Sequence, residues 1–325
     1  MRKWRGLLAL AVAAIVSIPS YAIIVVGGRD SSGVLNNSGT NLNPAPFNLG
    51  SYTGRFGGFL GTAIGPQHLI TATHVGGSAT FLYADGGAVE QSYNITLVGT
   101  QNDLAIYQIN GPQTFSHYVP IYTGTNEVGK QLVAIGNGTT RGNPVNTPST
   151  SNLAGWEWGG GGTLRSWGIN TSTNIVNPGL VGTFGGDYVY TTFTRTLDGN
   201  GNPINPDSYV FSGGDSGGAT FLLDDDGRWK LAGINSLVDQ VSQTSNGPGY
   251  AAALFDARGF FDGPNLLGGP DPIPLGSYAT RISSRQEFIL GLVAVPEPGS
   301  IMLCGMVALP GLGWVVWQRR GKRRR

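Results

Sequence analysis

Short runs of alternating or apolar residues, separated by glycine-rich stretches, follow one another through the middle of this 325-residue chain. In Ser92–Val98, the side chains of Tyr93, Ile95 and Leu97 fall on one face of an extended backbone. Tyr188–Phe193 alternates in the same way, and Gln131–Gly136 is an apolar run of strand length. With 53 glycines and only 12% charged residues, turns are frequent and long solvated helices are disfavoured. The sequence therefore predicts an all-β protein.

Turn and helix signals refine this prediction. The apolar runs at 221–223 and 230–234 flank Asp224–Gly227, which predicts a hairpin. Ser283–Leu292 is the one convincing helix, with a serine cap and Glu287 in its first turn. We expect loops in the Gly-, Asn-, Ser- and Pro-rich segments 31–50, 137–151 and 256–274. Trp156–Gly162 is expected to be a flexible aromatic stretch, either facing substrate or packed as a loop.

Composition excludes several functional classes. One cysteine excludes a disulfide framework and a cysteine-based zinc site, and three histidines leave little for a histidine-based metal centre. We therefore expect no metal centre built on cysteine or histidine. The net charge is +1, but basic residues gather at the two ends, and acidic residues outnumber them between Ile23 and Leu292. An acidic middle without a basic cluster argues against binding to nucleic acid.

The first 22 residues have the pattern of a signal peptide. Arg2, Lys3 and Arg5 precede an apolar run from Leu7 to Ile18, and Ser20-Tyr21-Ala22 is a small-x-small cleavage site. The alternative is a first transmembrane helix, but the run of about 12 residues is too short to span a bilayer comfortably. We expect residues 1–22 to be removed on export.

The last segment, residues 293–325, contains a second targeting pattern. Val295-Pro-Glu-Pro-Gly-Ser300 is followed by an apolar stretch, Ile301–Trp317, and then by an arginine-rich tail. This order resembles the PEP-CTERM sorting signal of Gram-negative bacteria. The resemblance implies transient anchoring in the inner membrane, processing by an exosortase-type enzyme, and a final location in the periplasm, at the cell surface or outside the cell. The alternative is a plain tail anchor with a proline-rich hinge. Cys304 is read as a small apolar residue of this span.

Gly213-Gly214-Asp215-Ser216-Gly217-Gly218 is the strongest chemical signal in the chain. A serine hydroxyl is a poor nucleophile until a base takes its proton. Glycines around it allow a sharp turn that directs amide hydrogens at one point, where they stabilise an oxyanion. For the run taken alone, the alternative is a tight turn.

Partners for this serine occur upstream. His74 follows the strand-like run Leu69–Thr73, and Asp103 begins another apolar run, Asp103-Leu-Ala-Ile106. The order histidine, aspartate, serine is that of the chymotrypsin triad. The competing residues lack such motifs. His68 is expected to be a surface or turn residue, His117 has no assigned role, and Asp85, before two glycines, is expected to form a turn.

Several motifs together resemble the trypsin-like (chymotrypsin-fold) serine proteases, over residues 25–292. They are Gly61-Thr-Ala-Ile64, Thr71-Ala-Thr-His74, Asp103-Leu-Ala-Ile106, the Ser216 motif, Leu231-Ala-Gly-Ile-Asn-Ser236, Thr280-Arg-Ile-Ser283 and Phe288-Ile289. The resemblance implies two antiparallel six-stranded β-barrels, with the active site in the cleft between them and a short C-terminal helix. The implied activity is hydrolysis of protein or peptide substrates through an acyl-enzyme, with no organic cofactor.

The resemblance also implies a role for each site residue. Ser216 would be the nucleophile, His74 the general base and Asp103 its orienting partner. The amides of Gly214 and Ser216 would form the oxyanion hole.

Further residues would support the triad or select the substrate. Ser236 would lie near Asp103 and begin the substrate-binding strand. Val210 would form the base of the primary pocket and Val238 its wall, which favours small or medium apolar side chains. Asp215 would bind a new amino terminus, for which we expect trimming to Val25 or a substitute partner.

Some features depart from the family pattern. Val75 stands where a cysteine is usual, and all the family's disulfides are absent. The segment from Asp198 to Asn202, with Asp207, is consistent with a calcium loop or with a simple polar turn. The rival function is a catalytically silent surface or matrix binding protein of the same fold. An esterase of the α/β-hydrolase type is disfavoured because the order histidine, aspartate, serine differs from the order in those enzymes.

Overall fold

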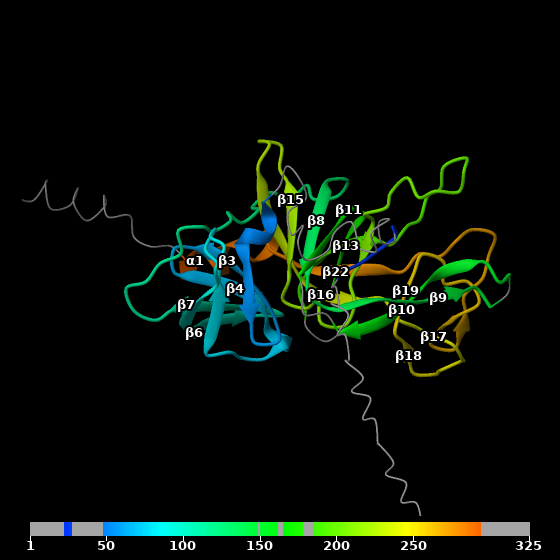
Figure 1. Cartoon of the computed structure of the whole chain (residues 1–325), viewed down its shortest axis with the longest axis horizontal. Helices are drawn as coiled ribbons and strands as arrows, with labels where there is room; N and C mark the ends of the chain where they lie inside the picture. The colour runs from blue at the N-terminus through cyan, green and yellow to red at the C-terminus, as the bar shows by residue number, and fades with distance from the viewer. Residues whose placement is uncertain (1–22, 28–47, 149, 162–164, 178–184, 294–325) are drawn as a thin grey trace, which may run out of the picture.

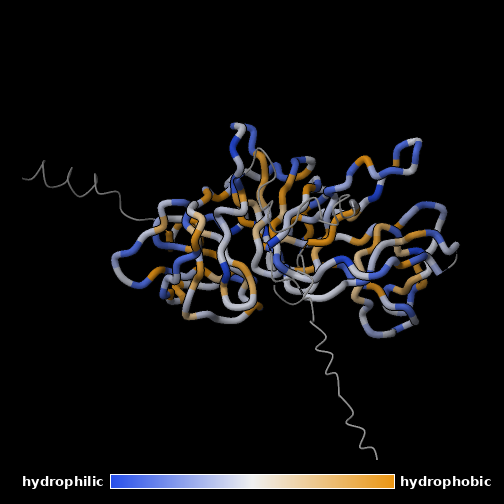
Figure 2. Tube along the Cα trace, in the orientation of Figure 1, coloured by the Kyte–Doolittle hydropathy of each residue, from blue (hydrophilic) through white to orange (hydrophobic). Residues whose placement is uncertain are grey.

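The computed structural model describes residues 23–27, 48–148, 150–161, 165–177 and 185–293 (Figure 1). The predicted signal peptide and sorting segment lie outside these ranges. Within them, strands dominate, and α1 (Gln286–Val293) is the only α-helix. No helix of this described part is long and apolar enough to cross a membrane. Hydrophobic segments gather along the strands and hydrophilic ones at the loops (Figure 2).

Six antiparallel strands form a closed barrel in the first half of the chain, in the order β2-β3-β4-β7-β6-β5. They are β2 (Thr53–Phe56), β3 (Phe59–Gly65), β4 (His68–Ala72), β5 (Thr80–Tyr83), β6 (Gln91–Gln101) and β7 (Leu104–Ile109). An aromatic and aliphatic core that includes Phe56, Phe81 and Phe115 fills this barrel. The prediction of a six-stranded barrel is confirmed for this half.

The second half is a seven-stranded antiparallel sheet in the order β11-β8-β15-β16-β22-β13-β12. Its strands are β8 (Gln131–Gly136), β11 (Ser166–Thr171), β12 (Asn174–Val176), β13 (Tyr188–Thr192), β15 (Ala219–Leu223), β16 (Trp229–Val238) and β22 (Gly276–Arg281). This sheet is a half-barrel. The side-chain amide of Asn170 on β11 donates to the carbonyls of Thr192 (3.0 Å) and Tyr209 (3.1 Å). It thus joins β11, one edge strand of the sheet, to the end of β13 near the other edge.

A further group of strands extends this half. β10 (Leu153–Gly161) lies between β9 (Thr139–Asn146) and β19 (Ala252–Leu254), and a second sheet has the order β18-β17-β20-β21. Those four strands are β17 (Val241–Ser242), β18 (Gly249–Tyr250), β20 (Phe261–Asp262) and β21 (Asn265–Leu266). The expectation of loops was therefore wrong for residues 139–146 and 156–161, because these residues pair along β9 and β10.

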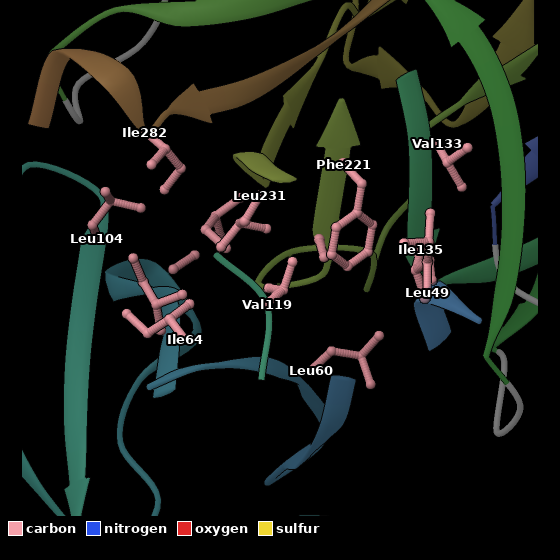
Figure 3. Packing of buried hydrophobic residues seen from close by; sticks show 14 of the residues in the cluster. Leu49, Leu60, Ile64, Leu104, Val119, Val133, Ile135, Phe221, Leu231 and Ile282 are labelled. Atoms are coloured by element: carbon pink, nitrogen blue, oxygen red, sulfur yellow. The ribbon is translucent and has the colours of Figure 1, made fainter. Parts of the chain in front are cut away.

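The two halves meet at an apolar seam (Figure 3). Leu60, Ile64 and Leu104 of the first barrel pack in one cluster with residues of β8, β15 and β16. Ile289 of α1 belongs to the same cluster. The short 3-10 helix Ser283–Arg285 and α1 follow β22, so the predicted C-terminal helix is confirmed. The all-β class is confirmed with it, as a closed six-stranded barrel, a half-barrel in place of the second closed barrel, and one short C-terminal helix.

Candidate active site

His74 and Asp103 meet because the strands that carry them are paired. β4 and β7 are antiparallel with Ala72 opposite Leu104, so the residues just beyond these positions lie at the same end of the barrel. His74 Nδ1 lies 2.8 Å from each carboxylate oxygen of Asp103, and the backbone N–H of His74 donates to Oδ1 at 3.1 Å. The Asp103 side chain is fully buried, whereas that of His74 remains 22% exposed. Asp103 therefore fixes both the ring and the backbone of His74.

Ser216 reaches the other ring nitrogen from the second half of the molecule. Its Oγ lies 2.7 Å from Nε2 of His74. The loop that carries Ser216 joins β14 (Tyr209–Val210) to β15. The three predicted residues thus form a continuous hydrogen-bonded chain across the seam between the two halves.

Glycine is required where the Ser216 loop touches the first barrel. Gly217 has a φ of +78°. A Cβ on it would lie 2.5 Å from Thr71 Oγ1 and 2.6 Å from the Leu60 carbonyl oxygen, closer than real contacts allow. The amides of Asp215, Gly217 and Gly218 donate to backbone carbonyls at 3.0–3.1 Å. The two predicted oxyanion-hole amides, those of Gly214 and Ser216, lie on either side of Asp215 in the sequence.

Asp215 points away from solvent into the second half and is 1% exposed. Its carboxylate accepts hydrogen bonds from the amides of Gly138 and Ser212, both at 2.8 Å, and from the Ser212 hydroxyl at 3.0 Å. Burial raises the pKa of Asp215 to about 6, although these hydrogen bonds and one from the backbone of Ile23 act to lower it.

Of the two expectations for Asp215, Val25 or a substitute partner, the structure has a substitute: the backbone of Ile23 donates a hydrogen bond to its carboxylate. Val25 instead pairs with Tyr209 in the ladder between β1 (Ile24–Val25) and β14. Arg141 holds the chain just beyond, where its guanidinium donates to the carbonyls of Val26 (3.3 Å) and Gly27 (3.0 Å). The residue that contacts Asp215 thus lies two positions earlier in the sequence than the start of the Val25 motif.

The three residues predicted for substrate binding lie on two strands. The hydroxyl of Ser236 on β16 donates to Asp103 Oδ2 at 2.5 Å. Val238, two residues further along β16, is half-buried, whereas Val210 on β14 is fully buried and lies opposite Ile24. Val238 packs against the apolar cluster that contains Val210.

Other residues of this region gave no recognisable signal in the sequence. Asn235 is fully buried, and its side chain accepts from Thr220 Oγ1 (2.8 Å) and donates to the Ile135 carbonyl (2.9 Å). Its backbone also pairs with Gly217 and Gly218, so it joins the Ser216 loop to the sheet. Its position immediately before Ser236 was the one available hint.

The other candidates lie apart from this chain of residues. His68 begins β4 and is 5% exposed, so its assignment to the surface was wrong; burial lowers its pKa. His117 stacks on Tyr52 with ring centroids 4.4 Å apart. Asp85 forms a turn, as expected, and its carboxylate accepts from the amides of Ser116 and His117.

The candidate calcium segment has the geometry of a polar turn. Oδ1 of Asp198 accepts hydrogen bonds from the amides of Asn200 (2.8 Å) and Asn202 (2.9 Å). The described ranges contain no group of three or more His, Cys, Asp or Glu side chains arranged to hold a metal ion.

No protein-family model matches the chain, and no curated protein matches it in sequence. Among solved structures it is similar to human heparin binding protein, with 14% identity and a TM-score of 0.45 over 82% of this chain and 99% of that one. Kallikrein-related peptidase 10 matches with 15% identity and a TM-score of 0.39, over 75% of this chain and 95% of that one. Similarity at this level indicates nothing about the activity of this chain.

Proposed function

We propose that this chain is a serine endopeptidase that hydrolyses peptide bonds through an acyl-enzyme. The observation that carries the proposal is the continuous contact from Ser216 Oγ through the His74 ring to the buried Asp103 carboxylate, at 2.7 and 2.8 Å. A nucleophile, a base and a group that orients the base are the requirements of this chemistry. A protein that only binds a ligand has no need for all three.

Each residue has a defined step. His74 Nε2 takes the proton of Ser216 as Oγ attacks the substrate carbonyl carbon, and later gives it to the leaving amine. Asp103 accepts the Nδ1–H hydrogen bond, which fixes the tautomer and stabilises the imidazolium. Ser236 satisfies one oxygen of this buried carboxylate. Water then attacks the acyl-enzyme with His74 again as base, so no organic cofactor enters the reaction.

The oxyanion of the tetrahedral intermediate would be bound by the amides of Gly214 and Ser216. For specificity, we propose that Val210 and Val238 bound the primary pocket. Neither side chain offers a charge to a Lys or Arg residue, and a branched side chain at Val238 narrows the space beside Ser236. Cleavage after Ala or Val is expected in a peptide library, and a strong preference for Lys or Arg would contradict this pocket.

We also propose that the protein is exported and cut after Ala22, and that its C-terminal segment is a PEP-CTERM signal processed by an exosortase-type enzyme. The cut would give Ile23 a free amine beside the Asp215 carboxylate, a suitable ion pair for a buried acid. Mass spectrometry of the mature protein is expected to find Ile23 as the first residue. A start beyond Gly28 would contradict the pairing with Asp215.

Labelling with a serine-directed fluorophosphonate tests the proposed reaction. We expect the wild-type protein to label and to cleave peptides, and Ser216→Ala to lose both, with turnover lower by at least about a thousand-fold. Ser245→Ala, at an exposed serine, is the matched control and should label normally. If the folded wild-type protein neither labels nor cleaves, the chain is instead a silent binding protein of this fold.

A further inference from the structure

A polar cavity of about 280 Å³ is formed by residues from both halves of the molecule. The first half contributes residues in and around the 3-10 helix Leu49–Tyr52, β2 and the turn that follows β5, and the second half contributes Arg165, next to β11. The lining consists of three glycines and of Asn48, Ser51, Thr53, Ala84 and Arg165. Pockets for drug-sized ligands begin at about 300 Å³, so this cavity suits a smaller molecule.

Arg165 gives the cavity its charge. No carboxylate is among the described residues that line the cavity, and the side chain of Arg165 is 17% exposed. Its Nη1 donates to the carbonyls of Thr53 (2.5 Å) and Gly50 (3.4 Å) and to Thr53 Oγ1 (3.3 Å). Its Nε–H has no acceptor among the described residues. Burial lowers the pKa of Arg165, so its charge is poorly solvated and would be stabilised by an anion.

The two hydroxyl groups of the lining already donate to the protein. Ser51 Oγ donates to the Asn48 carbonyl at 2.5 Å and lies 2.7 Å from Nε2 of His117. Thr53 Oγ1 donates to the Gly50 carbonyl at 2.9 Å. Of these three side chains, Arg165 is therefore the one with N–H groups still available to a ligand.

The charge of Arg165 is only partly balanced by the protein. Oε1 of Glu90 lies 3.3 Å from Nη2 of Arg165, whereas Oε2 of the same carboxylate is held by Arg55 at 2.6 Å. Two arginines thus share one carboxylate, and Arg55 is its closer partner. The Asp85 carboxylate, in the turn after β5, accepts hydrogen bonds from backbone amides instead. A further negative group beside Arg165 would therefore be favourable.

We propose that this cavity binds a small carboxylate, with its carboxyl group on the guanidinium of Arg165. A planar guanidinium presents paired N–H donors that match the two oxygens of a carboxylate. Residues of both halves would surround the ligand, so its binding would stabilise their union. None of the candidate triad residues lines the cavity, and the proposal does not rest on the proposed function.

Calorimetric titration of the folded chain with succinate, at an ionic strength held constant with sodium chloride, tests the site. We expect saturable binding to wild type and binding weaker by at least about tenfold in Arg165→Gln, which lacks the charged donor. Arg228→Gln removes the same charge from an exposed turn, and this matched control should bind like wild type. His74→Gln should also bind like wild type, because the anion is expected away from the candidate triad.

Glu90→Gln has an expected effect of the opposite sign. It removes the carboxylate that competes for Arg165 and should tighten succinate binding by about three- to tenfold. This variant also keeps the test decisive if Arg165→Gln fails to fold.

Three results would overturn the proposal. They are wild-type protein that does not bind succinate, a folded Arg165→Gln that binds it equally well, and Glu90→Gln without tighter binding. Inorganic phosphate is the comparison ligand, and phosphate that binds more tightly than succinate would contradict the assignment to a carboxylate.

Discussion

At the scale of single residues, the buried carboxylate of Asp215 gives a prediction about pH. In a chain that still carries Ala22, the pKa of Asp215 is raised from 3.8 to about 6 in the folded state. The folded state then holds a proton that the unfolded chain releases, so the contribution of Asp215 to stability is largest below pH 4 and falls as pH rises to 6. The loss is about 3 kcal/mol for a shift of this size. Urea unfolding between pH 4 and pH 7 measures it.

A chain that begins at Ile23 is the comparison. Its amine offers Asp215 a cation, so the decline between pH 4 and pH 6 should be smaller or reversed. Asp215→Asn in the longer chain removes the ionisable group and should remove the decline. Equal pH profiles for all three proteins would show that Asp215 is not coupled to the chain terminus.

Sequence motifs were enough to select each member of the candidate triad, because the nucleophile, the base and the orienting acid each need a particular side chain. The register of the amino terminus was missed for a physical reason. Ile23 and Val25 pack in one apolar cluster, and Ile24 and Val26 pack in another. Because side chains of extended backbone repeat every two residues, a shift by two leaves the same faces buried. The positions of Asn235 and Arg165 depend on long-range contacts that no local pattern encodes.

At the scale of strands, closure of the second half depends on Asn170. Its two side-chain hydrogen bonds join β11 to Thr192 and to Tyr209, where the sheet itself is not continuous. Asn170→Ala should lower the free energy of unfolding by about 2 kcal/mol, at roughly 1 kcal/mol for each hydrogen bond. Thr171→Ala, at the exposed next position, should cost far less. Similar losses in both variants would mean that the edge of β11 does not need this bridge.

Strands were predicted correctly where their own residues alternate in polarity or are mostly apolar. Gln131–Gly136 is β8 with the same bounds, and the hairpin around Asp224–Gly227 forms between β15 and β16. β9 was missed because it contains glycine and Pro144, which usually mark loops. Proline is tolerated there because β9 is the edge of its sheet, and its register with β10 is interrupted by bulges. The pairing of β9 is supported by packing into an apolar cluster, which no local sequence pattern predicts.

At the scale of the whole molecule, the candidate triad is divided between the two halves, so the seam holds it together. Phe221 lies in the seam cluster, whereas Phe115 lies inside the first barrel, and both are buried. Replacing either by Ala should cost about 3–5 kcal/mol through the cavity it leaves. At a temperature where both variants are folded, Phe221→Ala should label more slowly with fluorophosphonate than Phe115→Ala. Equal labelling would mean that the seam does not control the approach of Ser216 to His74.

Ile23 has a φ of +52°, and this torsion has a consequence for the timing of the proposed activity. A left-handed conformation at a β-branched residue costs about 1–3 kcal/mol. That torsion is defined by the carbonyl carbon of Ala22, so hydrolysis of the bond between them abolishes it. The proposed export cut would thus relieve local strain and create the cation for Asp215 in one event. Under the proposed function and export, activity would be timed to passage out of the cytoplasm, and the cytoplasmic proteins of the producing cell would not meet the finished enzyme.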